Sequence, residues 1–353
     1  SGAVAIVHQM WPFMKGNNIV KLLLNTANKD ITGYDENVHG QGLLDLDEAT
    51  KPQGATGIPT TGRTNGGVAS LSGSASGANI QSAGIFKDVM ILDSYERNFT
   101  VDLSQSYNIV DTRTLKPAKN LLVGNNFDFH YGFAKSNNID AFGIDEYSLL
   151  VSTNESGSIS GLKAGYQLND YFTVSVGHVK EQDTFLGYDM SGVYGDVTGA
   201  DTTYAAVDFG YSFDSNWSMF ANYQHGFTQV NANTANTMLV KTDALQTNSW
   251  AVGARYKSGK HTIAASVSAP TAVLDGSFKY RVPTDRTYDG IVTYADRNLD
   301  LTNSEREIDL SAAYTYDFSQ DVSFTAYAEH RENYKHVAGK QAQEFGAQIK
   351  IRF

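Results

Sequence analysis

The sequence predicts a mainly β protein, an antiparallel transmembrane β-barrel of about 12 strands that follows a linker and a short helical segment. Short segments with alternating apolar and polar residues follow one another from residue 98 to the C-terminus. Only 41% of the 353 residues are hydrophobic, although the chain contains 20 Tyr and 18 Phe. No window approaches about 18 uninterrupted apolar residues, which excludes a membrane-spanning helix. Barrel strands of about 10 residues alternate their side chains, and this alternation lowers the mean hydropathy.

Charge and cysteine content narrow the class of protein. The formal net charge of -11 argues against binding to nucleic acid. The absence of cysteine excludes disulfides and thiolate metal sites and is typical of an exported protein. The first residues, from Ser1 to Val4, read as the middle of a helix and not as a start. We therefore expect the chain to be the C-terminal part of a longer precursor without its signal peptide.

Residues 1–50 are expected to end a separate globular domain. Apolar helices are predicted at 3–14 and 17–27. The order of features resembles the tail of a subtilisin-like serine protease, on three stretches: Ser1-Gly2, the Leu-Leu-Asn-Thr-Ala sequence at 23–27, and 40–49. In that family the nucleophilic Ser and its Asp, His and Asn partners lie upstream of such a tail, so no catalytic residue is assigned here. His8 is expected to be a packed core residue of an apolar helix.

Residues 51–97 are predicted to connect that domain to the barrel. From 51 to 75 the chain is rich in Gly, Ser, Thr and Pro without a hydrophobic period, which predicts a flexible linker. From 76 to 97 apolar residues return among charged ones, such as Ile85 among Lys87 and Asp88. This segment is expected to run through the pore of the barrel. The alternative is a surface helix that tethers two domains.

Residues 98–353 are predicted to form the barrel itself. On one face of each predicted strand the residues are apolar, and we place these strands at 99–103, 127–133, 147–151, 162–168, 172–176, 205–213, 217–227, 250–256, 263–267, 310–318, 322–328 and 345–353. In a barrel the opposite, polar face lines the lumen, whereas in a soluble sandwich it meets water, and periodicity does not separate the two. The predicted lumen-facing residues are Asp102, Asp128, His130, Lys163, Arg255, Glu307, Asp309, Glu329, Arg331, Lys350 and Arg352.

The lengths of the connections favour the barrel. Tight links are expected at 169–170, 214–215, 258–259 and 319–320, with a longer turn at 136–140, all on one side of the membrane. Long connections at 106–125, 181–201, 231–244 and 270–303 fall on the other side. Short periplasmic turns and long external loops alternate in this way in outer-membrane barrels. The same parity predicts that 98–105 is the first strand and pairs with the last. Aromatic residues beside the short turns predict an interfacial girdle.

The last nine residues carry the most specific pattern. Five apolar residues share one face of this strand, and the chain stops on an aromatic residue: Phe345, Ala347, Ile349, Ile351 and Phe353. The pattern resembles the terminal strand of a bacterial outer-membrane barrel, whose closing aromatic is the recognition signal for the barrel-assembly machinery. The alternative is an ordinary edge strand of a soluble sheet.

No cofactor or metal is expected. Acidic residues gather among glycines in the long connections, for example at Asp189, Asp196 and Asp201. Their spacing matches no known calcium loop, so we interpret them as solvated surface charge. The barrel is not expected to be an enzyme.

The chain is expected to contain, in this order, a subtilase-like end, a linker, a pore segment and a barrel. This order resembles an autotransporter of the type V secretion class of Gram-negative bacteria. The resemblance implies a monomeric barrel in the outer membrane, in contact with lipids, lipopolysaccharide and the barrel-assembly machinery. It also implies that the barrel exports its own protease passenger to the cell surface and anchors it there. Two alternatives stay open: a porin-like channel with a plug, and a soluble β-rich domain.

Overall fold

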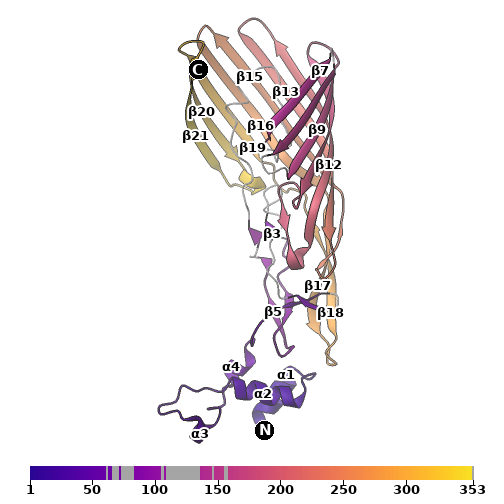
Figure 1. The fold of residues 1–353 in the computed structure, drawn as a ribbon, viewed down its shortest axis with the longest axis vertical. Coiled ribbons are helices and arrows are strands. Elements are labelled where there is room, and N and C mark those ends of the chain that lie inside the picture. Colours follow the sequence, from indigo (N-terminus) through magenta and orange to yellow (C-terminus); the bar gives the residue numbers. More distant parts are fainter. Residues whose placement is uncertain are drawn as a thin grey trace.

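A computed structural model describes residues 1–60, 63–65, 71–72, 83–104, 107–108, 136–144, 147–154 and 158–351 (Figure 1). The protein is mainly β, and its largest element is an antiparallel sheet of 11 described strands. The predicted strand at 127–133 lies outside the described residues, so the predicted count of about 12 is not tested. In spatial order the sheet contains β21 (Ala342–Ile351), β20 (Val322–Glu332), β19 (Ile308–Asp317), β16 (His261–Asp275), β15 (Leu245–Ser258), β13 (Trp217–Asn233), β12 (Asp196–Ser212), β10 (Phe172–Gln182), β9 (Ile159–Gln167), β8 (Tyr147–Asn154) and β7 (Ser136–Ile144).

The four tight links predicted from the sequence are confirmed, and they lie together at the upper end of the sheet in Figure 1. Turn chemistry explains each of them. Asp214 accepts hydrogen bonds from the backbone N–H groups that begin the next strand, and Asn169 and Ser319 do the same in their turns. Gly259 supplies the positive φ of 57° in the fourth. Strand β21 also runs toward this end.

The long connections lie at the opposite end and carry structure of their own. They contain β11 (Asp189–Met190), the 3₁₀ turns η2 (Gly192–Tyr194) and η3 (Tyr334–His336), and the strands β14 (Leu239–Thr242), β17 (Ser277–Arg286) and β18 (Val292–Asp300). Strands β14, β17 and β18 form a three-stranded sheet below the large one (Figure 1). The buried aromatic residues Phe185, Tyr188, Phe278 and Tyr280 belong to one core at this end. We call this part of the molecule the stalk.

Residues 83–101 pack onto the stalk. Strands β4 (Val89–Leu92) and β5 (Asn98–Val101) pair with each other, and the ring of Phe86 meets the edges of Tyr194 and Tyr280 at 5.1 and 5.0 Å. The other short strands in this region are β1 (Ile58–Thr60), β2 (Arg63–Asn65), β3 (Leu71–Ser72) and β6 (Tyr107–Asn108). The sequence predicts that residues 76–97 run through the pore. Their described part, 83–97, packs on the stalk, and passage through the pore stays a prediction.

Two sequence-based expectations about pairing are wrong. The segment predicted to be the first barrel strand, 98–105, does not pair with the last strand, because β5 pairs with β4 in a separate sheet. Residues 136–140, expected as a turn, begin β7, which pairs with β8 over its whole length. The polar sequence of β7 resembles a turn, but the hydrogen bonds of the neighbouring strand hold it extended. Residues 51–60 of the expected flexible linker lie against β4, where Gly57 bridges to Leu92.

Both predicted N-terminal helices are present. The helical unit contains α1 (Gly2–Met10), α2 (Gly16–Asn25), α3 (Glu36–His39) and α4 (Leu46–Thr50). Helix α1 ends before Pro12, which lacks an N–H and disfavours helix at the residue before it. His8 is exposed, contrary to expectation, and the neighbouring Val7 points into the core instead. Within the described residues, none of the helices is long and apolar enough to cross a membrane.

Candidate functional site: the two faces of the large sheet and the joint at Arg97

The outward face of the large sheet is apolar and exposed. Val176 is 61% exposed, Phe227 52% and Ile349 65%, and each belongs to the apolar set of its strand. Monomeric soluble proteins rarely expose a contiguous apolar patch larger than a few hundred Å². Other large apolar residues on this face include Tyr147, Leu149, Val151, Leu162, Tyr166, Phe172, Val207, Trp217, Tyr223, Val252, Ile263, Leu310, Tyr314, Phe345 and Ile351.

The inner face of the same sheet is polar and buried. Asn222 and Gln224 on β13, Ser249 on β15, and Glu329 and Arg331 on β20 are each less than one tenth exposed. Buried polar groups need hydrogen-bonding partners, and the sheet supplies several of them across neighbouring strands. This distribution is the reverse of a water-soluble sheet, whose buried face is apolar. The structure therefore distinguishes the barrel, whose polar face lines the lumen, from the soluble sandwich, whose polar face meets water, which periodicity alone does not.

Ion pairs on the inner face bring opposite charges together. Lys163 on β9 lies 3.5 Å from Asp208 on β12, which also accepts a hydrogen bond from the Asn222 amide. Arg331 contacts Glu329 at 3.0 Å and Glu344 on β21 at 3.7 Å. The attraction between paired charges offsets part of the desolvation penalty that each buried ion carries. The inner face can therefore hold its charged groups away from bulk water.

The predicted lumen-facing residues fall into four groups. Those on the inner face of the large sheet are Lys163, Arg255, Asp309, Glu329, Arg331 and, by alternation with Glu344, the exposed Lys350. Glu307 is fully buried just before β19, where it accepts a hydrogen bond from the backbone N–H of Lys335 at 2.8 Å. Asp102 is a correction: it lies outside the sheet, after β5, where it is exposed and bonds to Ser104. Asp128, His130 and Arg352 lie outside the described residues.

The predicted assembly signal lies on the outward face. Phe345, Ala347, Ile349 and Ile351 alternate along β21, and all four are exposed. Phe353 lies outside the described residues. Recognition of this strand by the assembly machinery stays a prediction.

The long strands change their pattern along their length. On the outward face of β13, Trp217 to Phe227 alternate as apolar or aromatic residues with one histidine, and Gln229, Asn231 and Asn233 then follow on the same face. The inner face changes in the opposite sense, since Val230 is buried in the stalk core. The outward apolar run is about 11 residues, which is the length of a membrane-spanning strand. We call this zone the apolar band.

Aromatic residues mark both edges of the apolar band. Beside the short turns, Trp217 packs on Tyr256 at 4.8 Å between ring centroids, and Tyr316 on Phe318 at 4.9 Å. The predicted concentration of aromatic residues at this rim is confirmed. At the other edge, Trp250 is the last apolar residue on the outward face of β15 before Asn248, and it lies opposite Tyr223 on β13. Aromatic side chains prefer the membrane–water interface in this manner.

An exposed apolar band over a buried polar face defines a class of protein, the β-sheet proteins whose outer surface suits lipid. No protein-family model matches the sequence, and no curated protein matches it. Among solved structures, outer-membrane OmpT of Vibrio cholerae is similar, with 11% identity and a TM-score of 0.36 over 60% of this chain and 62% of that chain. The toluene transporter TodX of Pseudomonas putida is similar with 12% identity and a TM-score of 0.30 over 57% and 60%. The chain thus spans about three fifths of these structures, and at such TM-scores its class depends on its own two faces.

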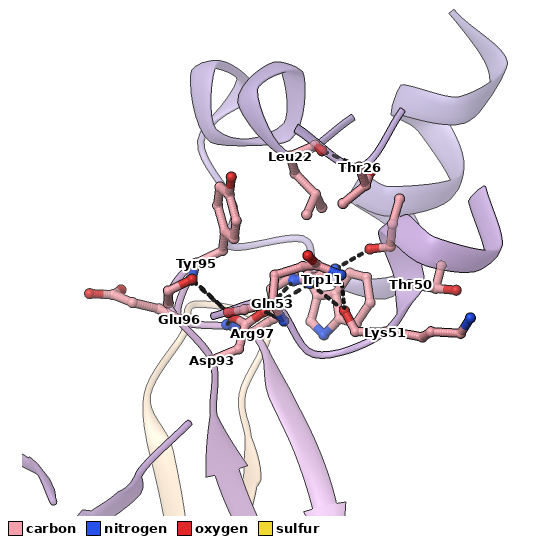
Figure 2. A network of polar contacts seen from close by, with 12 residues as sticks. Trp11, Leu22, Thr26, Thr50, Lys51, Gln53, Asp93, Tyr95, Glu96 and Arg97 are labelled. Atoms are coloured by element: carbon pink, nitrogen blue, oxygen red, sulfur yellow. Dashed lines mark hydrogen bonds and ion pairs between the residues drawn. The ribbon is translucent and has the colours of Figure 1, made fainter. Parts of the chain in front are cut away.

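A buried joint connects the helical unit to the stalk (Figure 2). The Arg97 side chain is completely buried, and its Nε and Nη2 donate to Asp93 at 3.0 and 2.8 Å. Nη1 donates to the backbone carbonyl of Ala49, and Nη2 also donates to that of Lys51 at 2.8 Å, so both bonds hold the end of α4. The guanidinium lies 4.5 Å from the centroid of the Trp11 ring. One cation thus connects Trp11 at the end of α1, the end of α4 and the turn between β4 and β5.

Asp93 completes the joint. Its carboxylate accepts hydrogen bonds from the backbone N–H groups of Gln53, Tyr95 and Arg97 at 2.9 to 3.1 Å. The tight turn between β4 and β5 is therefore fixed by the same ion pair that holds the helical unit. Sequence reasoning missed this pair, because Asp93 and Arg97 look like solvated charges among apolar residues. Their separation of four residues was the only available signal.

A second contact braces the helical unit from the side of the β17–β18 hairpin. Arg286 lies 4.2 Å from the centroid of the Phe13 ring and donates to the backbone carbonyl of Glu96. Its Nε donates to the carbonyl of Gly290 at 2.6 Å within the hairpin. Asn98 donates to Asp285 at 3.3 Å nearby. The long connection between β16 and β19 therefore reaches the helical unit directly.

Proposed function

We propose that the protein is an outer-membrane autotransporter barrel that exports and anchors an N-terminal, subtilisin-like passenger. The observation that supports this best is the order of parts along one axis (Figure 1). The short turns lie at one end of the apolar band, and the long connections, the stalk and the helical unit lie at the other. In outer-membrane barrels the short turns are periplasmic and the long loops external. The helical unit then stands at the cell surface.

The stalk and the joint supply a reason for export in one direction. The core that contains Phe86 and Tyr280, and the bonds of Arg97, form only when residues 51–101 are on the side of the long connections. Folding on that side removes unfolded chain from the equilibrium and so favours the exported state. The inner face of the sheet binds and orients charged groups but performs no bond chemistry in this proposal.

Cysteine labelling tests the orientation. The chain has no native cysteine, so single exposed sites report on their own side of the membrane. We expect a membrane-impermeant maleimide to label Asn17→Cys on α2 and Ala235→Cys in a long connection on intact cells. Ser215→Cys, in the short turn after β12, should react only after the outer membrane is permeabilised. Labelling of Ser215→Cys alone on intact cells contradicts the proposal.

The channel alternative makes a different prediction. A porin-like barrel should conduct ions steadily in planar bilayers, and removal of the helical unit, residues 1–50, should leave both conductance and surface delivery of the stalk unchanged. The autotransporter proposal expects a reporter fused in place of residues 1–50 to reach the cell surface. A soluble domain should remain in the aqueous phase during detergent phase separation, and this outcome excludes both membrane proposals.

A further inference from the structure

Arg306 lies over the outward face of the large sheet, at the edge of the apolar band nearest the stalk. It precedes β19, and its guanidinium extends over β15. Nη1 donates to the side-chain carbonyl of Asn248, and Nη2 donates to the backbone carbonyls of Asn248 at 3.2 Å and Ala269 at 3.4 Å. Asn248 shares its face with Trp250, because side chains two residues apart on a strand point the same way. Arg306 is therefore fixed to the outward surface.

The charge of Arg306 has no carboxylate beside it. Across the described residues, no Asp or Glu side chain lies within ion-pair distance of its guanidinium, and the oxygens that it contacts are all neutral. Its Nε is buried and finds no acceptor there. Arg281 on β17 differs, since it bonds to Asp296 at 2.9 Å. A partly buried cation normally needs an anionic partner to offset its lost hydration.

The surroundings of Arg306 suit the head group of a lipid. Asn248 lies opposite His225 on β13, and Trp250 lies opposite Tyr223, so these three side chains share the outward face with the Asn248 amide that holds the cation. Tyr and Trp prefer the depth of the lipid head groups. A guanidinium there pairs well with phosphate oxygens. Nη2 makes two of the described bonds and Nη1 only one, so one N–H of Nη1 is left for another partner.

We propose that Arg306 binds the phosphate of an anionic lipid in the outer leaflet, with Tyr223 and Trp250 against its sugar or acyl part. Lipopolysaccharide carries such phosphates on its lipid A. The inference rests on the proposed function, because the orientation derived there places the stalk edge of the apolar band in the outer leaflet. Basic pockets at the membrane surface are a general means of lipid recognition.

The experiment compares lipid binding by the full chain in vesicles. The wild type, Arg306→Gln and Arg281→Gln are refolded into phosphatidylcholine vesicles that contain either diphosphorylated or dephosphorylated lipid A, and retained lipid A is counted by native mass spectrometry. We expect Arg306→Gln to bind diphosphorylated lipid A about tenfold more weakly, a change of about 1.4 kcal/mol. Arg281→Gln removes the same charge outside the apolar band and should bind as the wild type does.

Two results overturn the proposal: equal binding by the wild type and Arg306→Gln, and equal binding of both lipids by the wild type. Displacement of lipid A by millimolar inorganic phosphate also overturns it, because the site then takes a free ion. If Arg306→Gln does not insert, Asn248→Ala, which removes one acceptor of the guanidinium, replaces it and should bind several-fold more weakly. Insertion is read separately by protease protection of the sheet, so failure of the membrane assignment is distinguishable from failure of the lipid site.

Discussion

Arg97 is a single buried charge on which the connection between two parts of the molecule depends. We expect Arg97→Met to destabilise the joint by about 3 to 5 kcal/mol, because it leaves the buried carboxylate of Asp93 without its counter-charge. The measure is the rate at which a protease cuts between the helical unit and β4. Lys51→Met removes an exposed ion pair nearby and should change this rate little. An unchanged rate in Arg97→Met contradicts the role given to the joint.

Ile349 tests the outward assignment of the terminal strand at the level of one side chain. Ile349→Lys should cost about 2 to 4 kcal/mol if the residue lies near the middle of the bilayer, because the ammonium group loses its hydration. Gln348→Lys adds the same charge on the opposite, polar face of β21 and should assemble normally. Assembly is followed by the different mobility of heated and unheated protein on a gel. Equal assembly of both variants contradicts the assignment.

At the scale of elements, strand β13 is the most informative, since its outward face changes character partway along. Ala221 lies inside the apolar band, and Asn231 lies beyond it on the same face. We expect Ala221→Lys to lower the free energy of unfolding in lipid by about 2 to 4 kcal/mol and Asn231→Lys to change it by less than about 0.5 kcal/mol. The measurement is urea unfolding in phosphatidylcholine vesicles. Similar losses in both variants contradict the position of the band edge.

The β17–β18 hairpin carries a pH-dependent interaction outside the band. Hydrogen bonds from Arg281 and then Lys279 lower the pKa of Asp296 to about 2. The folded pKa lies below the ordinary value of about 3.9, so this interaction stabilises the hairpin fully above that value. The stabilisation is lost as the pH falls from about 4 to about 2.

Hydrogen exchange of the hairpin amides in this pH window measures the effect. Protection in the wild type should fall toward that of Asp296→Asn as the acid concentration rises, while Asp296→Asn itself should change less. The effect should be small, because the group is exposed. A difference between the two proteins that does not depend on pH contradicts the ion-pair explanation.

At the scale of the whole molecule, the sequence predicted the repeated parts well. Alternation located ten of the 11 described strands of the large sheet, and turn residues such as Asp214 and Asn169 gave the parity of the links, because both signals are local. The sheet to which a strand belongs was harder to predict than the strand itself. Phe99 and Val101 alternate like a barrel strand, but Phe99 packs on Trp11 at 5.6 Å, against the core of the helical unit.

The two faces and the joint could not be derived from local patterns. Alternation is the same whether lipid or a protein core covers the apolar side, so only the exposed fractions of residues such as Val176 distinguish them. The joint depends on residues far apart in sequence, since Trp11 follows α1, Ala49 lies in α4 and Arg97 lies in the turn before β5. Of the predicted lumen residues, those on regular strands lie on the polar inner face of the sheet, and their place in a lumen stays a prediction, whereas Asp102 was misplaced together with its strand.

The separate cores predict that the molecule unfolds in stages. The helical unit has a small core of its own, formed by Val7, Trp11, Met14, Ile19, Leu22 and Ala49, whereas the sheet is held by backbone hydrogen bonds along all its strands. Small cores give marginal stability, and parts of a protein with few buried contacts open first. We therefore expect the helical unit to lose its structure while the sheet remains intact in lipid.

The three tryptophans report on these stages separately, because Trp11 belongs to the helical unit and Trp217 and Trp250 to the edges of the apolar band. In Trp217→Phe/Trp250→Phe, fluorescence comes from Trp11 alone and should shift to the red at a lower denaturant concentration than in Trp11→Phe. The transition of Trp11→Phe, which reports on the sheet, should also depend on the lipid, whereas the transition of Trp217→Phe/Trp250→Phe, which reports on the helical unit, should not. Transitions that coincide in both variants would mean that the joint at Arg97 couples the two parts into one cooperative unit.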